Sequence, residues 1–131
     1  MAVEYEFKVE VRDSMKGTES RTRELLQAQG FGVLTEIDVQ ATLRNKLDLK
    51  FRPYRILGAC NPALAHRALE AEPGVGVLLP CNVVVEQVSE EVTLVRFMEP
   101  ISALGLFANP ALEAVAQEAS ARLHKVAEAL Q

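Results

Sequence analysis

The opening residues of this chain alternate between apolar and charged side chains, and this period of two is the clearest local signal in the sequence. The apolar positions are Val3, Tyr5, Phe7, Val9 and Val11, and charged residues separate them. Successive side chains of a strand point to opposite faces. The pattern therefore predicts a strand with one buried and one solvated face, and a fold that covers one side of its sheet.

The end of the chain carries a different pattern, an apolar stripe at helical spacing. The stripe consists of Leu112, Val115, Ala116, Ala119, Leu123, Val126, Ala127 and Leu130. Asn109-Pro110 predicts where the helix begins, because asparagine caps a helix and proline at its first position lacks an N–H that would have no partner there. We expect this helix to end near Leu130 and to pack across a sheet face.

Strand and helix signals alternate between these two elements. They predict a helix over 15–29 closed by Gly30, a strand over 31–37, a helix over Val39–Leu47 capped by Asp38, a strand over Tyr54–Cys60, a helix over 62–70 capped by Asn61, and strands over 76–88 and 92–98. The order strand, helix, four strands, helix predicts an α+β fold with a mainly antiparallel, curved sheet and helices on one face. Residues 1–131 are expected to form a single domain.

Three details of this prediction depend on particular residues. Thr18 and Thr22 fall where the helix over 15–29 would carry large apolar side chains, so we expect it to pack mainly through its C-terminal half. Pro80 interrupts a β-branched stretch, which predicts an edge position or a bulge there. The candidate inner face of the helix after Asp38 consists of Ala41, Leu43 and Leu47.

The composition limits the classes of function. Hydrophobic residues make up 49% of the 131 residues, which is enough for one core. The net charge of −4, with scattered basic residues, argues against a nucleic-acid partner. No signal peptide and no run of about 18 apolar residues is present, so we expect a cytoplasmic protein without a membrane partner. Two cysteines are too few for a disulfide scaffold, and reduced thiols are expected.

Residues 51–82 hold both cysteines, one of two histidines and four of six prolines. Cys60 is expected between a strand and a helix N-terminus, where the helix dipole and free N–H groups lower the pKa of a thiol. The alternative is a small buried residue at a crowded corner. Cys81 is expected near Cys60 if the two strands pair antiparallel, and a reversible disulfide would then need Cα atoms within about 7 Å. The sequence has no Cys-x-x-Cys motif.

Other polar residues of this segment suggest a ligand site. Asn61 and Asn82 can cap helices, satisfy turns or bind a polar group of a ligand. Arg55, with Arg52 and Arg67, would suit an anionic small molecule, although single arginines are usually solvated. His66 would pair with Cys60 only if the fold brought them together, and a solvent-facing histidine is the alternative. The candidate ligand-binding residues are Cys60, Asn61, Cys81, Asn82, Arg55 and His66.

Nothing in these spacings supports a metal site built from Cys60, Cys81 and His66, so we expect no metal and no cofactor. The glycines do not form a phosphate loop, because Gly74 and Gly76 lead into an expected strand and not a helix. No motif identifies catalytic residues, which stay unknown.

Three segments together resemble a known family. They are GFGVLTEIDVQATL at residues 30–43, FRPYRILGACNPALAHRALEAEPGVGVLLPCNVVV at residues 51–85, and the closing amphipathic helix. These closely resemble the small bacterial and archaeal family called domain of unknown function 302, and its thermophile members in particular. The resemblance implies the order strand, helix, four strands, helix, a TATA-binding-protein-like shape, and members that are often dimers. The family has no established activity.

These observations leave three hypotheses. The first is a homodimeric module that binds a small ligand around Cys60-Asn61 and Cys81-Asn82. The second is an interaction domain that works by dimerising, since pairing protects exposed strand edges. The third is a thiol-dependent enzyme or redox sensor that uses Cys60, with Cys81 as its resolving partner.

Overall fold

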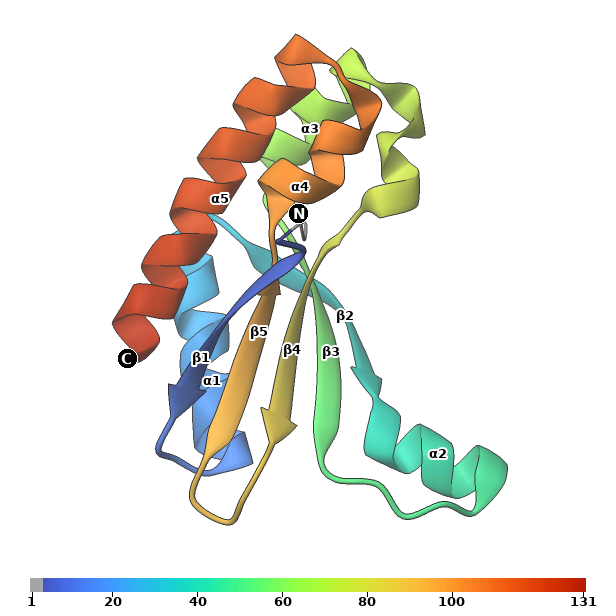
Figure 1. Cartoon of the computed structure of the whole chain (residues 1–131), viewed down its shortest axis with the longest axis vertical. Coiled ribbons are helices and arrows are strands. Elements are labelled where there is room, and N and C mark those ends of the chain that lie inside the picture. The colour runs from blue at the N-terminus through green and yellow to red at the C-terminus, as the bar shows by residue number, and fades with distance from the viewer. Residues whose placement is uncertain (1–3) are drawn as a thin grey trace.

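Five antiparallel strands form one sheet in the order β1-β5-β4-β3-β2 (Figure 1). The structure, a computed structural model, describes residues 4–131. The strands are β1 (Glu6–Val11), β2 (Gly32–Asp38), β3 (Tyr54–Cys60), β4 (Cys81–Gln87) and β5 (Thr93–Met98). The helices are α1 (Met15–Ala28), α2 (Val39–Leu47), α3 (Pro62–Ala71), α4 (Pro100–Leu104) and α5 (Pro110–Leu130), with 3-10 turns η1 (Pro73–Leu78) and η2 (Gly105–Phe107). This confirms the predicted α+β fold with an antiparallel sheet.

The predicted N-terminal strand is present as the edge strand β1, which pairs with β5 from Glu6 opposite Met98 to Val11 opposite Thr93. Val9 and Val11 are buried and Lys8 and Glu10 are exposed, as the alternation predicts. Tyr5 precedes the strand and is exposed. Val3, which the prediction included, lies outside the described residues.

Helices α1 and α5 contact each other, and both contact the sheet (Figure 1). All eight residues of the predicted α5 stripe are buried, which confirms that this helix packs on the sheet. The sheet contributes alternate residues from β3, β4 and β5 to the same core. The expected closure of α1 at Gly30 is also present, with φ of 85° at that glycine. No helix in the described part of the chain is long and apolar enough to cross a membrane.

The packing of α1 differs from its prediction. Its buried residues are Thr18, Thr22 and Leu26, so the helix packs along its whole length and not mainly through its C-terminal half. Threonine suits this position because its methyl group packs in the core while its hydroxyl can bond to the preceding turn. Thr22 does so, since its Oγ1 donates to the carbonyl oxygen of Thr18 over 2.7 Å.

Replacing Thr18 by Val is expected to raise the free energy of unfolding by about 1 kcal/mol, because the Thr18 Oγ1 is buried without a hydrogen-bond partner. Thr22→Val is the matched control on the next turn, and it removes a hydroxyl that is bonded. It is expected to be neutral or destabilising. Urea denaturation of both variants measures the difference, and equal shifts in the two would contradict this account.

The stretch over 76–88 is not one strand, and this part of the prediction is wrong. Its first residues belong to η1, and pairing begins at Cys81. Gly74 and Gly76 weaken strand formation, Val75 alone anchors the turn in the core, and Pro80 cannot donate to the sheet. Because Pro80 precedes the strand, it marks neither an edge nor a bulge, and β4 is central in the sheet.

Helix α2 extends from the end of β2 beyond the body of the sheet (Figure 1). The expected inner face is not buried: Leu43 is half-buried, and Ala41 and Leu47 are exposed. Asp38 caps the helix as predicted, by accepting a hydrogen bond from the Ala41 N–H over 2.9 Å. No residue of α2 is buried, and Ala41 and Leu47 face solvent in the isolated chain.

The sheet face turned away from the core carries an ion-pair network. Glu86 is 2% exposed, and its carboxylate oxygens accept hydrogen bonds from the Nε atoms of Arg52 and Arg96, each over 2.7 Å. Arg96 also reaches Glu6 over 2.8 Å. Burial by itself would raise the pKa of Glu86, but the hydrogen bonds and charges of the two arginines outweigh it and hold the pKa below its ordinary value.

Candidate functional site

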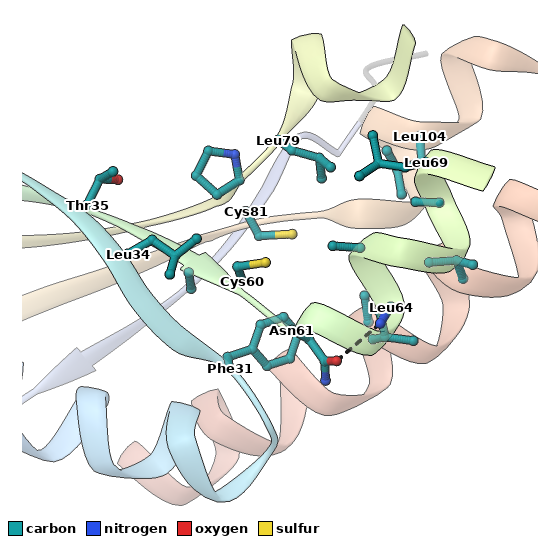
Figure 2. Close-up of a pocket in the computed structure, with 16 residues that line it drawn as sticks. Phe31, Leu34, Thr35, Cys60, Asn61, Leu64, Leu69, Leu79, Cys81 and Leu104 are labelled. Carbon is teal, nitrogen blue, oxygen red and sulfur yellow. Dashed lines mark hydrogen bonds between the residues drawn. The ribbon is translucent and has the colours of Figure 1, made fainter. Parts of the chain in front are cut away.

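An apolar pocket of about 320 Å³ lies where the ends of β3 and β4 meet α3 (Figure 2). One wall is α3, a second is formed by α4 and α5, and the third is β2 with the segment before it. No charged side chain lines it. The lining residues are Phe31, Leu34, Thr35, Ala59, Cys60, Asn61, Leu64, Ala65, Ala68, Leu69, Leu79, Pro80, Cys81, Leu104, Val115 and Ala119.

The helix caps predicted from the sequence hold two walls of the pocket together. Asn61 caps α3, and its Oδ1 accepts from the Leu64 N–H over 3.2 Å (Figure 2). Asn109 caps α5 by accepting from the Ala111 N–H over 3.0 Å. The Nδ2 of Asn109 also donates to the carbonyl oxygen of Ala71, so the start of α5 is tied to the end of α3.

Both cysteines line this pocket. The two cysteines were expected to be close if β3 and β4 pair antiparallel. The two strands do pair in this way, and Ala59 lies opposite Cys81. Cys60 is the last residue of β3 and Cys81 is the first of β4. The sequence therefore located the thiol pair, but Cys81 is in a regular strand pair and not in a bulge.

Burial determines the protonation state of both thiols. It raises the pKa of Cys60, which is opposite to the lowering expected from the helix N-terminus. Burial, and then the charge of Cys60, raises the pKa of Cys81 to about 11. Both thiols therefore stay protonated near neutral pH, which disfavours a thiolate nucleophile.

We expect iodoacetamide to alkylate Cys60 much faster than Cys81 in the folded protein at about pH 8, because Cys81 is the more deeply buried of the two and has the higher pKa. The rate at Cys81 should keep increasing until the pH approaches 11. Peptide mapping by mass spectrometry measures each rate. The two rates should converge in guanidinium chloride, and equal rates in the folded protein would contradict the prediction.

The bulge in this sheet lies in β2 and not at Pro80. The pairing of β2 with β3 shifts register between Val33 and Thr35, which leaves Leu34 without a partner. Bulges redirect side chains, and Leu34 lies at the pocket with 69% of its surface exposed (Figure 2). Leu34 was not among the predicted site residues, because no proline or glycine marks the bulge at that position.

A close contact beside the pocket requires a glycine in β3. A Cβ atom at Gly58 would lie 2.1 Å from the Oγ1 of Thr35 and 2.8 Å from the Cγ of Pro80. Thr35 and Pro80 both line the pocket. The absence of a side chain at Gly58 therefore lets two pocket walls approach each other.

Three of the six candidate site residues do not line the pocket. Asn82 follows Cys81 in β4, so the alternation of the strand directs its side chain to the opposite face, where it lines a separate groove. Arg55 lies in an ion-pair cluster with Glu19, Glu36 and Asp38. His66 is on the solvent side of α3, with 76% of its side chain exposed, and lies 3.4 Å from Glu70. The pocket thus brings together Cys60, Asn61 and Cys81.

The arginines of residues 51–82 do not form an anion site. Arg52 binds Glu86 and lies over the ring of Phe51, and Arg67 lies 3.2 Å from Glu118. Each of these guanidinium groups, like that of Arg55, already has a carboxylate partner. Among residues 4–131, no group of three or more His, Cys, Asp or Glu side chains is arranged to hold a metal ion.

The remaining pocket residues were not predicted as site residues, because they look like ordinary core positions in the sequence. Leu104, Val115 and Ala119 come from α4 and α5, far along the chain from the cysteines. A useful signal is the small size of Ala65, Ala68 and Ala119, which leaves space between the helices and the strands. Small residues on facing elements predict a cavity only once the packing is known.

Comparisons with known proteins agree on one family. The family described as "Domain of unknown function DUF302" matches residues 7–130. The chain is also similar to a solved structure from Bacillus stearothermophilus, described as an uncharacterized conserved protein DUF302. That similarity has 33% sequence identity and a TM-score of 0.90, and it covers 98% of this chain and 100% of the other. No curated protein gives a significant match.

Proposed function

The chain belongs to the family of domains of unknown function DUF302, and because that membership assigns no activity, we propose from the pocket that the protein binds a small apolar ligand. The observation that carries this proposal is a cavity of about 320 Å³ whose lining residues are mostly apolar. Small-molecule sites are concave, apolar and provided with a few polar groups. The volume falls at the lower end of the range for such sites, about 300 to 1,000 Å³.

The lining residues limit the chemistry of the ligand. The polar side chains of the pocket are those of Thr35, Asn61, Cys60 and Cys81, and none of these is charged near neutral pH. A charged ligand group inside the pocket would lose part of its hydration without finding a side chain of opposite charge. The ligand is therefore neutral and mainly aliphatic or aromatic, and burying about 200 Å² of its surface would contribute about 5 kcal/mol to binding.

The absence of tryptophan from the sequence allows a direct test. Leu34→Trp places a single fluorophore at the pocket, and Val88→Trp places one in the turn after β4, away from it. Titration with a neutral aliphatic alcohol of medium chain length should change the emission of the first variant in a saturable way. It should leave the second unchanged. Parallel changes in both variants, or none in the first, would contradict the proposal.

A variant that fills the pocket provides the second test. Ala65 is half-buried on α3 and lines the cavity, so Ala65→Phe in the Leu34→Trp background is expected to weaken alcohol binding at least about tenfold. The matched control is Ala63→Phe on the exposed side of the same helix, which should bind like the parent. Equal binding by both would place the ligand elsewhere.

We also propose that the protein is a homodimer, as the family resemblance implies. Around the end of β2 and along α2, three large apolar side chains are exposed, namely Ile37, Leu47 and Leu49. An edge strand with such neighbours is commonly covered by a partner. Light scattering at micromolar concentration should give the mass of two chains, and Leu47→Glu should reduce it to one. A wild-type monomer would overturn this part of the proposal.

Two further proposals concern the shape of the fold and the chemistry of the thiols. The TATA-binding-protein-like shape implied by the family resemblance is supported by an antiparallel sheet whose helices α1 and α5 pack together. Thiol chemistry at Cys60 with Cys81 as resolving partner is supported by the shared pocket, but the raised pKa values of both thiols rank it below ligand binding.

A further inference from the structure

We infer that Cys60 and Cys81 together bind a soft monovalent cation, copper(I), on the wall of the apolar pocket. Figure 2 shows the side chains of both cysteines at the pocket that they line, and the two thiols are near enough for the charge of Cys60 to raise the pKa of Cys81. They come from the ends of neighbouring strands, because Ala59, the residue before Cys60, is paired with Cys81. This site shares one wall of the pocket with the proposed apolar ligand, but it needs only the two sulfur atoms.

The number and type of ligands select the metal. Thiolate sulfur prefers soft ions such as copper(I) over hard ions such as magnesium or calcium. Structural zinc sites use four protein ligands and catalytic ones three. In the described part of the chain no group of three or more possible ligand side chains includes these cysteines. Copper(I) is stable with two thiolate ligands in a linear arrangement, so a pair of cysteines is sufficient for it.

The surroundings of the pair favour the same ion. Apart from Thr35 and Asn61, the side chains that line the pocket with the two cysteines are apolar. Such a setting offers no oxygen-rich coordination to a strongly hydrated ion, whereas a soft ion is held by the sulfur atoms alone. The complex keeps one negative charge, and α3 begins two residues after Cys60 with its positive dipole end nearest to this site.

Binding exchanges two protons for one cation. The two S–H bonds break, two S–Cu bonds form, and two protons go to the buffer, so that neither sulfur nor copper changes oxidation state. Metal affinity then depends on pH through both thiols. The apparent affinity for copper(I) is expected to rise about 100-fold per pH unit between about pH 6 and 8, against about tenfold for a single thiol.

The test is an anaerobic competition between the full chain and a chromophoric copper(I) chelator. The wild-type protein should withdraw one copper(I) per chain, with ultraviolet sulfur-to-copper absorption and the steep pH dependence. Cys60→Ser and Cys81→Ser should each weaken binding at least about 100-fold. Asn82→Ser, next to Cys81 but outside the pocket, is the control and should bind like the wild type.

Three results would overturn the inference: wild-type affinity no higher than that of the double serine variant, a pH dependence of one proton, or retention of binding in either single variant. Circular dichroism confirms that the serine variants are folded. If the serine variants do not fold, alkylation of the wild-type protein decides the question. One equivalent of copper(I) should protect both thiols from alkylation, and a lack of protection counts against the site. Alcohol binding by the Leu34→Trp variant that keeps both cysteines, measured without copper, tests the proposed function separately.

Discussion

Replacing Arg96 by Met is expected to lower the free energy of unfolding by about 3 kcal/mol, because it leaves the buried carboxylate of Glu86 with one partner in place of two. The remaining partner, Arg52, is about half exposed and held less firmly. Removing one member of a buried ion pair costs more than the pair contributes, since the other charge stays buried. Urea denaturation near neutral pH measures the loss.

The pH dependence identifies the cause of this loss. The pKa of Glu86 is lowered in the folded protein, so its stabilisation is present above the unfolded pKa of about 4.5 and is lost as the pH falls through the folded pKa. The gap between wild type and Arg96→Met should therefore narrow below about pH 4. Arg67→Met, at an exposed pair with Glu118, is the control and should change stability by less than about 1 kcal/mol. Similar losses in both variants, or a gap independent of pH, would refute the account.

Gly58→Ala is expected to destabilise the protein by about 1 to 3 kcal/mol and to disturb the pocket. The added Cβ would meet the Oγ1 of Thr35 at 2.1 Å and the Cγ of Pro80 at 2.8 Å, so both residues must move. Since both line the pocket, binding of the alcohol by a Leu34→Trp background should weaken as well. Thermal unfolding and the fluorescence titration measure the two effects together.

Two comparisons isolate the contact at Gly58. Gly32→Ala in the neighbouring strand is the control, because a Cβ there meets nothing within 4 Å, and its stability should stay within about 1 kcal/mol of the wild type. Thr35→Ala combined with Gly58→Ala should recover part of the loss, since it removes the nearer of the two clashes. Equal losses for the two glycines would show that the contact is unimportant.

The sequence predicted the fold where its patterns had one interpretation. The alternation around Val9 and the stripe around Leu123 each match a single period, and both elements are present with the expected buried faces. The segment at residues 76–80 misled the prediction because the valines of the whole stretch over 76–88 favour a strand, whereas Pro80 delays pairing until Cys81. Thr22 misled it because a backbone hydrogen bond satisfies its buried hydroxyl, and hydrophobicity does not reveal that bond.

The candidate site was predictable in part. Cys60, Asn61 and Cys81 follow from strand and cap signals, and these signals located one end of the pocket. Leu34 depends on a register shift, and Val115 on how α5 lies across the sheet, and neither is encoded locally. The direction of the pKa change at Cys60 also depends on the packing around it, because burial outweighs the helix N-terminus.

The pairing of the first strand with the last one bears on how the chain folds during synthesis. Glu6 lies opposite Met98, so β1 leaves the ribosome long before β5, the strand that it pairs with, exists. Contacts this distant in sequence slow folding, and unpaired strands aggregate in the meantime. The charged residues Lys8 and Glu10 on the exposed face of β1 would keep the waiting segment soluble. The alternation that identifies this strand also protects the nascent chain until β5 emerges.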